Sequence, residues 1–273
     1  MRQDEILEML LRETQLSVRT LAERFDVSAM TIYRDLQALE NQDLIIRTTG
    51  GAMIKPSLQY GRGWSERLQE QTLVKELLGR QAASLVEPNQ VVIFDAGTTV
   101  LEVARRIPAQ LRLTAVTNSL PTATVLGEKP DVTVLLAGGQ FRPDTASVLG
   151  PLTTSFLNQI NADVAILSTA VVNLEQGLSN FSLDSVAAKR TMIARARKTI
   201  LVCDFSKFQK SALITVSSLH AVHTMVTDDR MPESMRARIR QEGIELILVP
   251  YNEGRLSEMA AINPGPLHDN EGP

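Results

Sequence analysis

The stretch from Leu16 to Ala52 reads LSVRTLAERFDVSAMTIYRDLQALENQDLIIRTTGGA, and it decides the fold of the first part of the chain. Apolar residues recur every three or four positions in two short segments, which predicts amphipathic helices over 18–25 and 28–41. Ser28 suits the start of the second helix because its side-chain oxygen can accept a hydrogen bond from a free backbone N–H one turn on. The run LIIRTTGG then predicts a short wing. Together these elements predict a winged helix-turn-helix.

Hydrogen-bonding and basic side chains gather on the face of the second helix that carries no core residues. In this layout that helix enters the major groove of DNA, and an arginine in the wing can reach the backbone or the minor groove. Two helices with a turn also occur in small helical domains that bind protein instead. The polar face and the wing favour double-stranded DNA. The candidate contacts are Arg19, Ser28, Met30, Thr31, Tyr33, Arg34, Arg47, Gly50 and Gly51.

The same stretch resembles the DeoR family of bacterial transcription regulators. The resemblance rests on VSxxTIYRDL at 27–36, on LIxR at 44–47 and on GGA at 50–52. It differs at Thr49, where the family usually has histidine before the two glycines. The resemblance implies a DNA operator as partner and, because the family contains mostly repressors, repression as the mode of action.

Composition is typical of a globular protein, with 44% hydrophobic and 22% charged residues in 273. No run of 18 apolar residues is present, which predicts no membrane span. The opening MRQDEILEML carries acids and no long apolar run, so we expect no secretory signal and a cytoplasmic protein. The single Cys203 lies in the apolar run TILVCDF, which favours a buried core thiol over a nucleophile.

Charge gives the DNA-binding prediction no support. Residues 1–55 hold seven basic and nine acidic side chains, a net charge of −2. Because neutralising phosphates supplies most non-specific affinity, one copy of this domain would bind DNA weakly. Two or more copies in one assembly would compensate, so we expect a homo-oligomer, either a dimer or a tetramer.

Further along, the chain divides into a small and a large domain. We predict a winged helix-turn-helix at 1–56, a linker at 57–72, an α/β domain at 73–251 and a disordered tail at 252–273. A first helix over 1–15 would complete the small core, and another is expected over 65–85. Short apolar strands then alternate with helices, which predicts a Rossmann-like parallel sheet covered on both faces. The expected strands are 91–94, 113–117, 132–136, 164–167, 200–203, 224–226 and 244–249, and the expected helices are 99–107, 120–126, 153–159, 184–196 and 233–241.

Four of these strands end in polar or glycine-rich turns: DAGTT at 95–99, TNS at 117–119, GG at 138–139 and DFSK at 204–207. Ligands of open α/β sheets bind beyond the carboxyl ends of the strands, and free N–H groups at a helix start favour an anion. Such residues also cap helices, so Asp95 can be only a cap and Lys207 only a surface charge. Four converging turns favour a small anionic ligand.

The resemblance extends through this half, in DAGTT, TNS, the double glycine, LGP at 149–151 and DxSKF at 204–208. These look like the sensor domain of DeoR regulators, which is similar in fold to ribose-5-phosphate isomerase. That implies a phosphorylated sugar or catabolic intermediate as effector. By residue match, the effector would contact Lys75, Asp95, Gly97, Thr98, Thr99, Asn118, Gly138, Gly139, Asp204 and Lys207. The chain departs from the family at Ser168-Thr169, where a glycine-containing turn is usual, at Ser185, usually glutamate, and at Gln209, usually glycine.

An enzyme is the alternative, because a sugar-phosphate isomerase needs a carboxylate base with a lysine nearby. Asp95, Asp204 and Lys207 offer such a set. An isomerase has no need of a DNA-binding domain, however, so we predict a regulator with no catalytic residues and no cofactor. His220 and His223 lack further ligands close in sequence, and no metal site is predicted.

Overall fold

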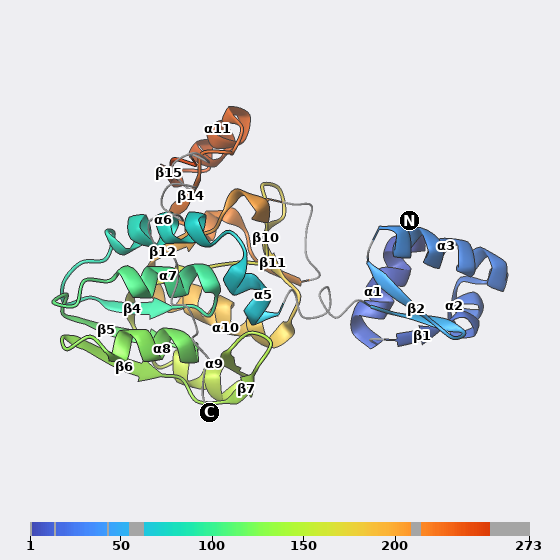
Figure 1. Cartoon of the computed structure of the whole chain (residues 1–273), viewed down its shortest axis with the longest axis horizontal. Helices are drawn as coiled ribbons and strands as arrows, with labels where there is room; N and C mark the ends of the chain where they lie inside the picture. Colours follow the sequence, from blue (N-terminus) through green and yellow to red (C-terminus); the bar gives the residue numbers. More distant parts are fainter. Residues whose placement is uncertain (1, 14, 43, 55–62, 209–213, 252–273) are drawn as a thin grey trace, which may run out of the picture.

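The computed structural model describes residues 2–13, 15–42, 44–54, 63–208 and 214–251. The predicted tail, Gln209 and the first part of the predicted linker lie outside these ranges. Within them the chain forms a small N-terminal domain and a larger α/β domain (Figure 1).

The N-terminal domain is a winged helix-turn-helix, as predicted. Its elements are α1 (Arg2–Glu13), β1 (Gln15–Ser17), α2 (Val18–Phe25), α3 (Ala29–Asn41), β2 (Ile45–Thr48) and β3 (Gly51–Ile54). The predicted apolar faces meet in one core, in which Ile6, Leu21 and Ile32 are fully buried. The sequence did not indicate β1, which is too short for a pattern; it pairs with β3, so that β3 is the central strand of the sheet β1-β3-β2.

The prediction of one helix over 65–85 is wrong. The chain forms α5 (Trp64–Gln69) and α6 (Thr72–Ala83), separated by an extended Glu70 and by Gln71 in the left-handed region at φ 52°. The segment 69–72 reads QEQT and offers no apolar side chain to a continuous buried face, so nothing in the core opposes the break. α5 lies within the stretch predicted as linker and contacts α7 (Thr98–Arg106).

The larger domain contains a seven-stranded sheet in the order β15-β14-β12-β9-β4-β5-β6, with every neighbouring pair parallel. The predicted strands are confirmed, and those at 91–94, 113–117 and 132–136 match residue for residue. The sheet consists of β4 (Val91–Phe94), β5 (Leu113–Thr117), β6 (Val132–Leu136), β9 (Ala162–Leu167), β12 (Ala196–Val202), β14 (Thr224–Asp228) and β15 (Glu245–Val249).

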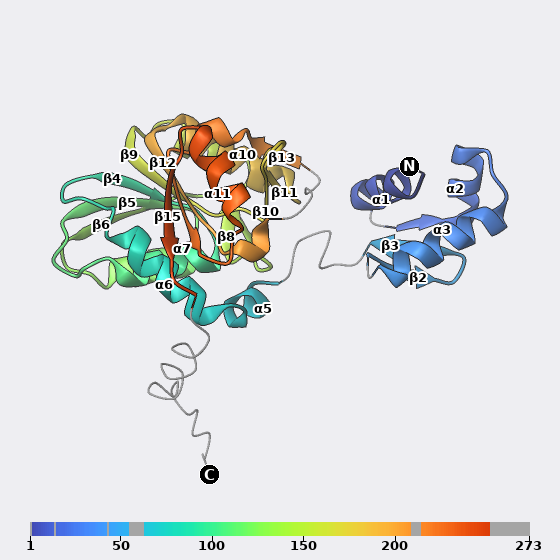
Figure 2. The same ribbon diagram turned by 90° about the horizontal axis from the view of Figure 1, so that it is seen from above.

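Helices cover both faces of this sheet (Figure 2). Alternate strand residues point to opposite faces, so Val92 and Phe94 pack with α6 and α7 while Ile93 packs in the core under the other face. The remaining helices are α8 (Leu120–Gly127), on the α7 side, and α9 (Pro151–Leu157), α10 (Leu183–Ala194) and α11 (Glu233–Gln241), on the opposite side. Each of these helices begins and ends within two residues of its predicted bounds, and α9 differs by two residues at both ends.

Short elements that the sequence did not indicate lie between these strands and helices. They are the hairpin β7 (Gln140–Arg142) and β8 (Ser147–Leu149), the antiparallel sheet of β10 (Val171–Asn173), β11 (Gly177–Asn180) and β13 (Ile214–Ser217), and the turns η1 (Phe205–Lys207) and η2 (Leu219–Ala221). The chain builds β4, β5 and β6 toward one edge and then returns to add β9 beside β4. The carboxyl ends of β4 and β9 therefore form the topological switch point.

None of the helices in the described ranges combines the length and the apolar character that crossing a membrane requires.

Candidate functional site

A cavity of about 600 Å³ opens at the switch point between β4 and β9. Its size suits a small organic ligand. It is bordered by α5, the start of α6, the turns after β4, β5, β9 and β12, the β7–β8 hairpin and the start of α10. Its charged lining residues are Arg67, Glu70, Lys75, Asp95, Arg142, Asp144, Lys189, Asp204 and Lys207.

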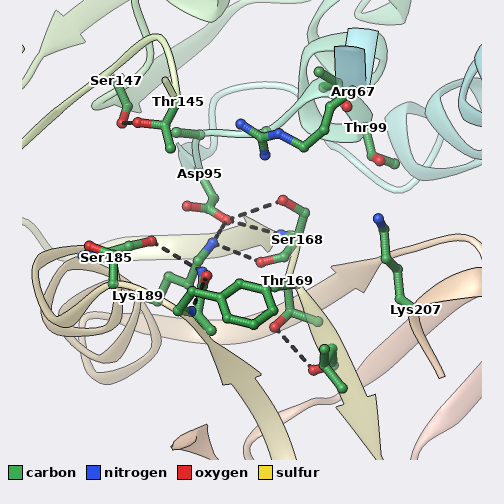
Figure 3. A pocket seen from close by; sticks show the side chains of 18 of the residues that line it. Arg67, Asp95, Thr99, Thr145, Ser147, Ser168, Thr169, Ser185, Lys189 and Lys207 are labelled. Carbon is green, nitrogen blue, oxygen red and sulfur yellow. Dashed lines mark hydrogen bonds and ion pairs between the residues drawn. The ribbon is translucent and has the colours of Figure 1, made fainter. Parts of the chain in front are cut away.

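At the floor of the cavity, Asp95 and Lys189 form a buried ion pair (Figure 3). Asp95 is 2% exposed and Lys189 4% exposed. The same carboxylate oxygen accepts from the backbone N–H of Ser168 at 3.0 Å, and Lys189 donates to the Ser168 carbonyl at 2.8 Å. These contacts join the end of β4 to the end of β9 and to α10. The two charges can be buried because each has hydrogen-bonding partners.

Ser168, one of the departures from the family pattern, packs against Gly97. A Cβ atom on Gly97 would lie 2.3 Å from the Ser168 hydroxyl oxygen. Gly97 therefore leaves room for the side chain that this protein carries at the end of β9.

Besides Lys189 and Arg142, three further cations reach the cavity from separate elements: Arg67 from α5, Lys75 from α6 and Lys207 from η1. The guanidinium of Arg67 uses few of its hydrogen-bond donors. Its Nη2 donates to the Asp144 carbonyl over a long 3.4 Å, and its buried Nε finds no hydrogen-bond partner among the described residues. Burial lowers the pKa of Arg67 below its usual value. A buried guanidinium with unused donors is a ready partner for an anion.

Lys75 is also held away from water, with 5% of its surface exposed. Burial lowers the pKa of Lys75 to about 8. Its ammonium donates to the carbonyl oxygen of Arg67, so Lys75 fastens α5 to α6 across the break between them.

The other side of the cavity carries hydroxyl groups (Figure 3). Thr145 and Ser147 share a hydrogen bond of 2.7 Å, and Ser185 accepts from the Asn180 amide at 3.2 Å. Ser185 stands where the family usually has glutamate, so this wall has a neutral side chain in place of a carboxylate. Hydroxyls and amides of this kind suit the hydroxyl groups of a sugar.

The cavity brings together most of the residues that the sequence assigned to it. Those that line it are Lys75, Asp95, Gly97, Thr98, Thr99, Asn118, Asp204 and Lys207. Asp204 also caps its own turn, because its carboxylate accepts from the Ser206 N–H at 3.0 Å. Capping was the alternative role that the sequence allowed for polar residues in these turns.

The double glycine does not line the cavity. The Gly138 carbonyl accepts from the Thr153 hydroxyl at 2.8 Å, and Gly139 has φ 144°. A Cβ on Gly139 would lie 2.6 Å from the Leu149 carbonyl. Close packing of the turn after β6 against β8 and α9 therefore explains Gly139, whereas a Cβ on Gly138 would have no heavy atom within 4 Å.

Arg67 and Lys189 are the main lining residues that we did not assign from the sequence. In the sequence, Arg67 resembles an ordinary surface charge on one long helix. The break at Gln71 separates α5 from α6, and Arg67 on α5 lines the cavity. Lys189 had a signal, because it matches a lysine of the family pattern, but its partner Asp95 lies 94 positions away.

In the N-terminal domain, several predicted DNA contacts lie on the exposed face of α3. Met30 is 63% exposed and Tyr33 37% exposed, and Arg34 is exposed beside them. Ser28 and Thr31 serve the helix start, where the Ser28 hydroxyl accepts from the Thr31 N–H at 3.2 Å. Arg19 is exposed and pairs with Glu23 at 2.8 Å.

The wing differs from the prediction in two places. Gly50, with φ 84°, forms the turn between β2 and β3, but Gly51 is buried, and a Cβ there would lie 2.3 Å from the Leu16 carbonyl. Gly51 is thus required for the contact of β3 with β1. Arg47 lies against α3, where its Nη1 donates to the Gln37 side-chain oxygen at 2.8 Å.

Cys203 lies in the core as predicted, and burial raises the pKa of its thiol. His223 accepts from the Thr199 N–H at 3.1 Å, which gives it a structural part. No cluster of three or more histidine, cysteine or acidic residues suited to a metal occurs in the described ranges.

Both domains match models of known families. Residues 2–57 match the DeoR-like helix-turn-helix domain, and residues 70–229 match the DeoR C terminal sensor domain. The glycerol-3-phosphate regulon repressor of Escherichia coli (strain K12) is 33% identical over 247 residues, which cover 90% of this chain and 98% of that protein. The chain belongs to the DeoR family.

Other relatives of this DeoR regulator carry similar names. The HTH-type transcriptional regulator GlpR of Haloferax volcanii is 32% identical over 246 residues, covering 90% of this chain and 96% of that protein. Among solved structures, ribose 5 phosphate isomerase A from Neisseria gonorrhoeae overlaps 50% of this chain and 53% of its own with 16% identity and a TM-score of 0.38. The curated relatives are named as regulators, which points to a regulator rather than an enzyme.

Proposed function

We propose that this DeoR regulator represses an operon for carbohydrate catabolism, and that a phosphorylated sugar or sugar-derived intermediate in the switch-point cavity modulates its hold on the operator. The observation that carries this proposal is the set of three cations, Arg67, Lys75 and Lys207, around one cavity with the Nε of Arg67 unpaired among the described residues. The relatives' names, among them a glycerol-3-phosphate regulon repressor, support the same class of effector.

In this proposal the phosphate binds between the three cations, with the buried Thr98 and Thr99 at the start of α7 as further donors. The sugar hydroxyls extend toward Asp95 and toward the hydroxyl wall of Thr145, Ser147 and Ser185. Gly97 allows the ligand to approach the backbone after β4. Gly138 and Gly139 do not line the cavity and are not proposed as effector contacts.

The path from effector to DNA runs through α5. This helix is the first described element after the N-terminal domain, and it carries Arg67 into the cavity. Lys75 holds the carbonyl of the same residue. A phosphate that attracts the side chains of Arg67 and Lys75 changes the contact between Lys75 and α5. It shifts DNA affinity only to the extent that it binds one arrangement of α5 more tightly than the other.

DNA is bound by α3, with Met30, Tyr33 and Arg34 toward the bases, and Arg19 toward the phosphates. The predicted homo-oligomer, a dimer or tetramer, remains part of the proposal because residues 1–55 carry a net charge of −2. We also propose that 1–56 is the DNA-binding domain and 73–251 the effector-sensing domain. A cytoplasmic location is part of the proposal too, because a regulator there has access to the chromosome.

The test is selection of DNA sequences by the purified full chain, repeated with a panel of sugar phosphates and the matching unphosphorylated sugars. We expect binding to one operator that a single phosphorylated compound alters and its unphosphorylated form does not. Arg34→Ala should weaken operator binding and leave the effector bound, and Lys207→Ala should do the reverse. If the chain selects no DNA sequence at moderate salt, the proposal is rejected.

A further inference from the structure

Arg47 lies across the gap between the wing and the second helix of the helix-turn-helix. It belongs to β2, where it pairs with Ala52 of β3. Its guanidinium does not extend beyond the turn at Gly50 but lies on α3. Nη1 donates to the Gln37 side-chain oxygen at 2.8 Å, and the guanidinium carbon lies 5.7 Å from the centre of the Tyr33 ring. Two contacts therefore fix the arginine beside α3.

The amide of Gln37 is itself held in one orientation. Its nitrogen donates to the Glu40 carboxylate at 3.2 Å and to the Asn41 side-chain oxygen at 3.1 Å. With both amide hydrogens directed along the helix, the oxygen is left to face Arg47. The acceptor is in place before any DNA arrives, which lowers the entropy lost when Arg47 is ordered in a complex.

These residues lie on the face of α3 that is exposed. Met30, Tyr33 and Gln37 are spaced by three and four positions, so they form one stripe along the helix. Arg47 is exposed alongside that stripe, and its other guanidinium nitrogens have no hydrogen-bond partner in the part of the chain that the structure describes. A planar edge with free N–H donors thus borders the stripe.

We propose that Arg47 reads a guanine in the major groove next to α3, and that Gln37 and Tyr33 position it for this. A guanidinium edge matches the O6 and N7 acceptors of guanine, and arginine on guanine is the commonest specific contact to a base. The ring of Tyr33 supports the guanidinium from the side, as aromatic faces do for arginine. The inference rests on the proposed function, and it replaces the expectation that Arg47 reaches the backbone or the minor groove.

The competing role is a phosphate contact, which differs in what it requires. A phosphate can also be bound by lysine as a point charge, so Arg47→Lys would keep part of a phosphate contact at every sequence. Reading guanine through two parallel hydrogen bonds needs the arginine fork held at one angle. Replacing Arg47 with lysine, or removing the acceptor on Gln37, therefore separates the two roles.

The experiment uses the full chain and its selected operator, together with operators in which each base pair is changed in turn. For the wild-type chain we expect one G·C pair next to the α3 contacts whose replacement lowers affinity about 5- to 150-fold. Arg47→Lys should abolish the preference at that pair and leave the preferences at other positions. Gln37→Ala should weaken the same preference. Gln37→Glu keeps an acceptor for Arg47 but loses the two donors that orient it, so it should weaken the preference less than Gln37→Ala does, while the added charge lowers affinity for all sequences.

Arg19→Ala is the matched control, because Arg19 is an exposed arginine in the same domain whose side chain pairs with Glu23 of its own helix, α2. It should weaken binding to every operator by a similar factor. If Arg47→Lys behaves like this control, or keeps the full preference, the inference is wrong while the proposed function stands. If the wild-type chain selects no DNA sequence, the proposed function itself is wrong. That outcome is therefore distinct from a failure of the inference about Arg47 alone.

Discussion

The side chains that we propose to act in the two domains lie in opposite environments. On α3, Met30, Tyr33 and Arg34 are exposed, and the core beneath them contains other residues. In the sensor cavity, Asp95 and Lys189 are almost fully buried and are part of the structure that holds β4, β9 and α10 together. The difference teaches that function and stability are separable in the DNA-binding domain and coupled in the sensor domain.

The strongest test of this contrast is Lys189→Met. It leaves the buried carboxylate of Asp95 without its counter-ion, so we expect the sensor domain to lose about 3–5 kcal/mol of unfolding free energy. Chemical denaturation of the full chain measures this loss. The double variant Asp95→Asn with Lys189→Met should recover most of it, since no unpaired charge remains. A loss below about 1 kcal/mol in the single variant would break the contrast.

Asp35 is the exception within the DNA-binding domain, and it sharpens the comparison. It lies on α3 but is 7% exposed, and it accepts from Arg2 at 2.6 Å and Gln3 at 3.1 Å, tying α3 to α1. We expect Asp35→Ala to lower the stability of this domain by about 1.5–3 kcal/mol, as for hydrogen bonds to a charged group. Hydrogen exchange of α1 and α3 amides is the measurement. Unchanged protection in both helices would contradict the expectation.

Lys75 makes the sensor domain sensitive to pH in a way that α3 is not. Its pKa of about 8 lies below the ordinary lysine value, and a bound phosphate favours the protonated form. Effector affinity should thus fall about twofold between pH 7 and 8, and by up to about tenfold per pH unit above that. Titration of the effector by calorimetry measures it. Lys75→Arg, if it still binds effector, should show no such fall. Operator affinity without effector serves as the reference.

The smallest expected effect is in the exposed pair Arg19–Glu23, with side chains 88% and 66% exposed. Glu23→Ala should change the stability of the DNA-binding domain by no more than about 0.5 kcal/mol, because solvent and salt screen such pairs. The same variant releases Arg19 and should leave DNA affinity equal or higher. Thermal unfolding and operator titration give the two readings, and a loss of more than about 1 kcal/mol would show that this surface is structural after all.

The main elements of the fold could be predicted because they depend on local patterns. β4, β5 and β6 are apolar runs with clear ends, and α3 starts at a serine whose hydroxyl caps it, as expected. The break between α5 and α6 could not be predicted in this way, because QEQT is compatible with helix and only the tertiary arrangement decides. The short strands β1, β7 and β8 have three residues each, too few to show a period.

The cavity was predictable where residues follow strands and not where long side chains reach across the fold. Asp95, Asn118 and Asp204 lie in turns whose place is set by the sheet. Arg67 arrives on a separate helix, and no spacing links it to those turns. Gly139 shows the converse limit: a glycine at a strand end has the same appearance in the sequence whether it admits a ligand or a neighbouring backbone.

The position of β3 in the small sheet has a mechanical consequence. The described part of the N-terminal domain ends at Ile54, the last residue of β3, and β3 is bonded on both sides, to β1 and to β2. Hydrogen bonds between antiparallel strands run perpendicular to them, so tension along β3 loads both ladders in shear at once. We expect an optical trap that pulls on this domain through its C-terminal end to find a single abrupt rupture. Gradual peeling would show that β3 behaves like an edge strand. We therefore expect the DNA-binding domain to move as a rigid body when the sensor domain pulls on the end of β3.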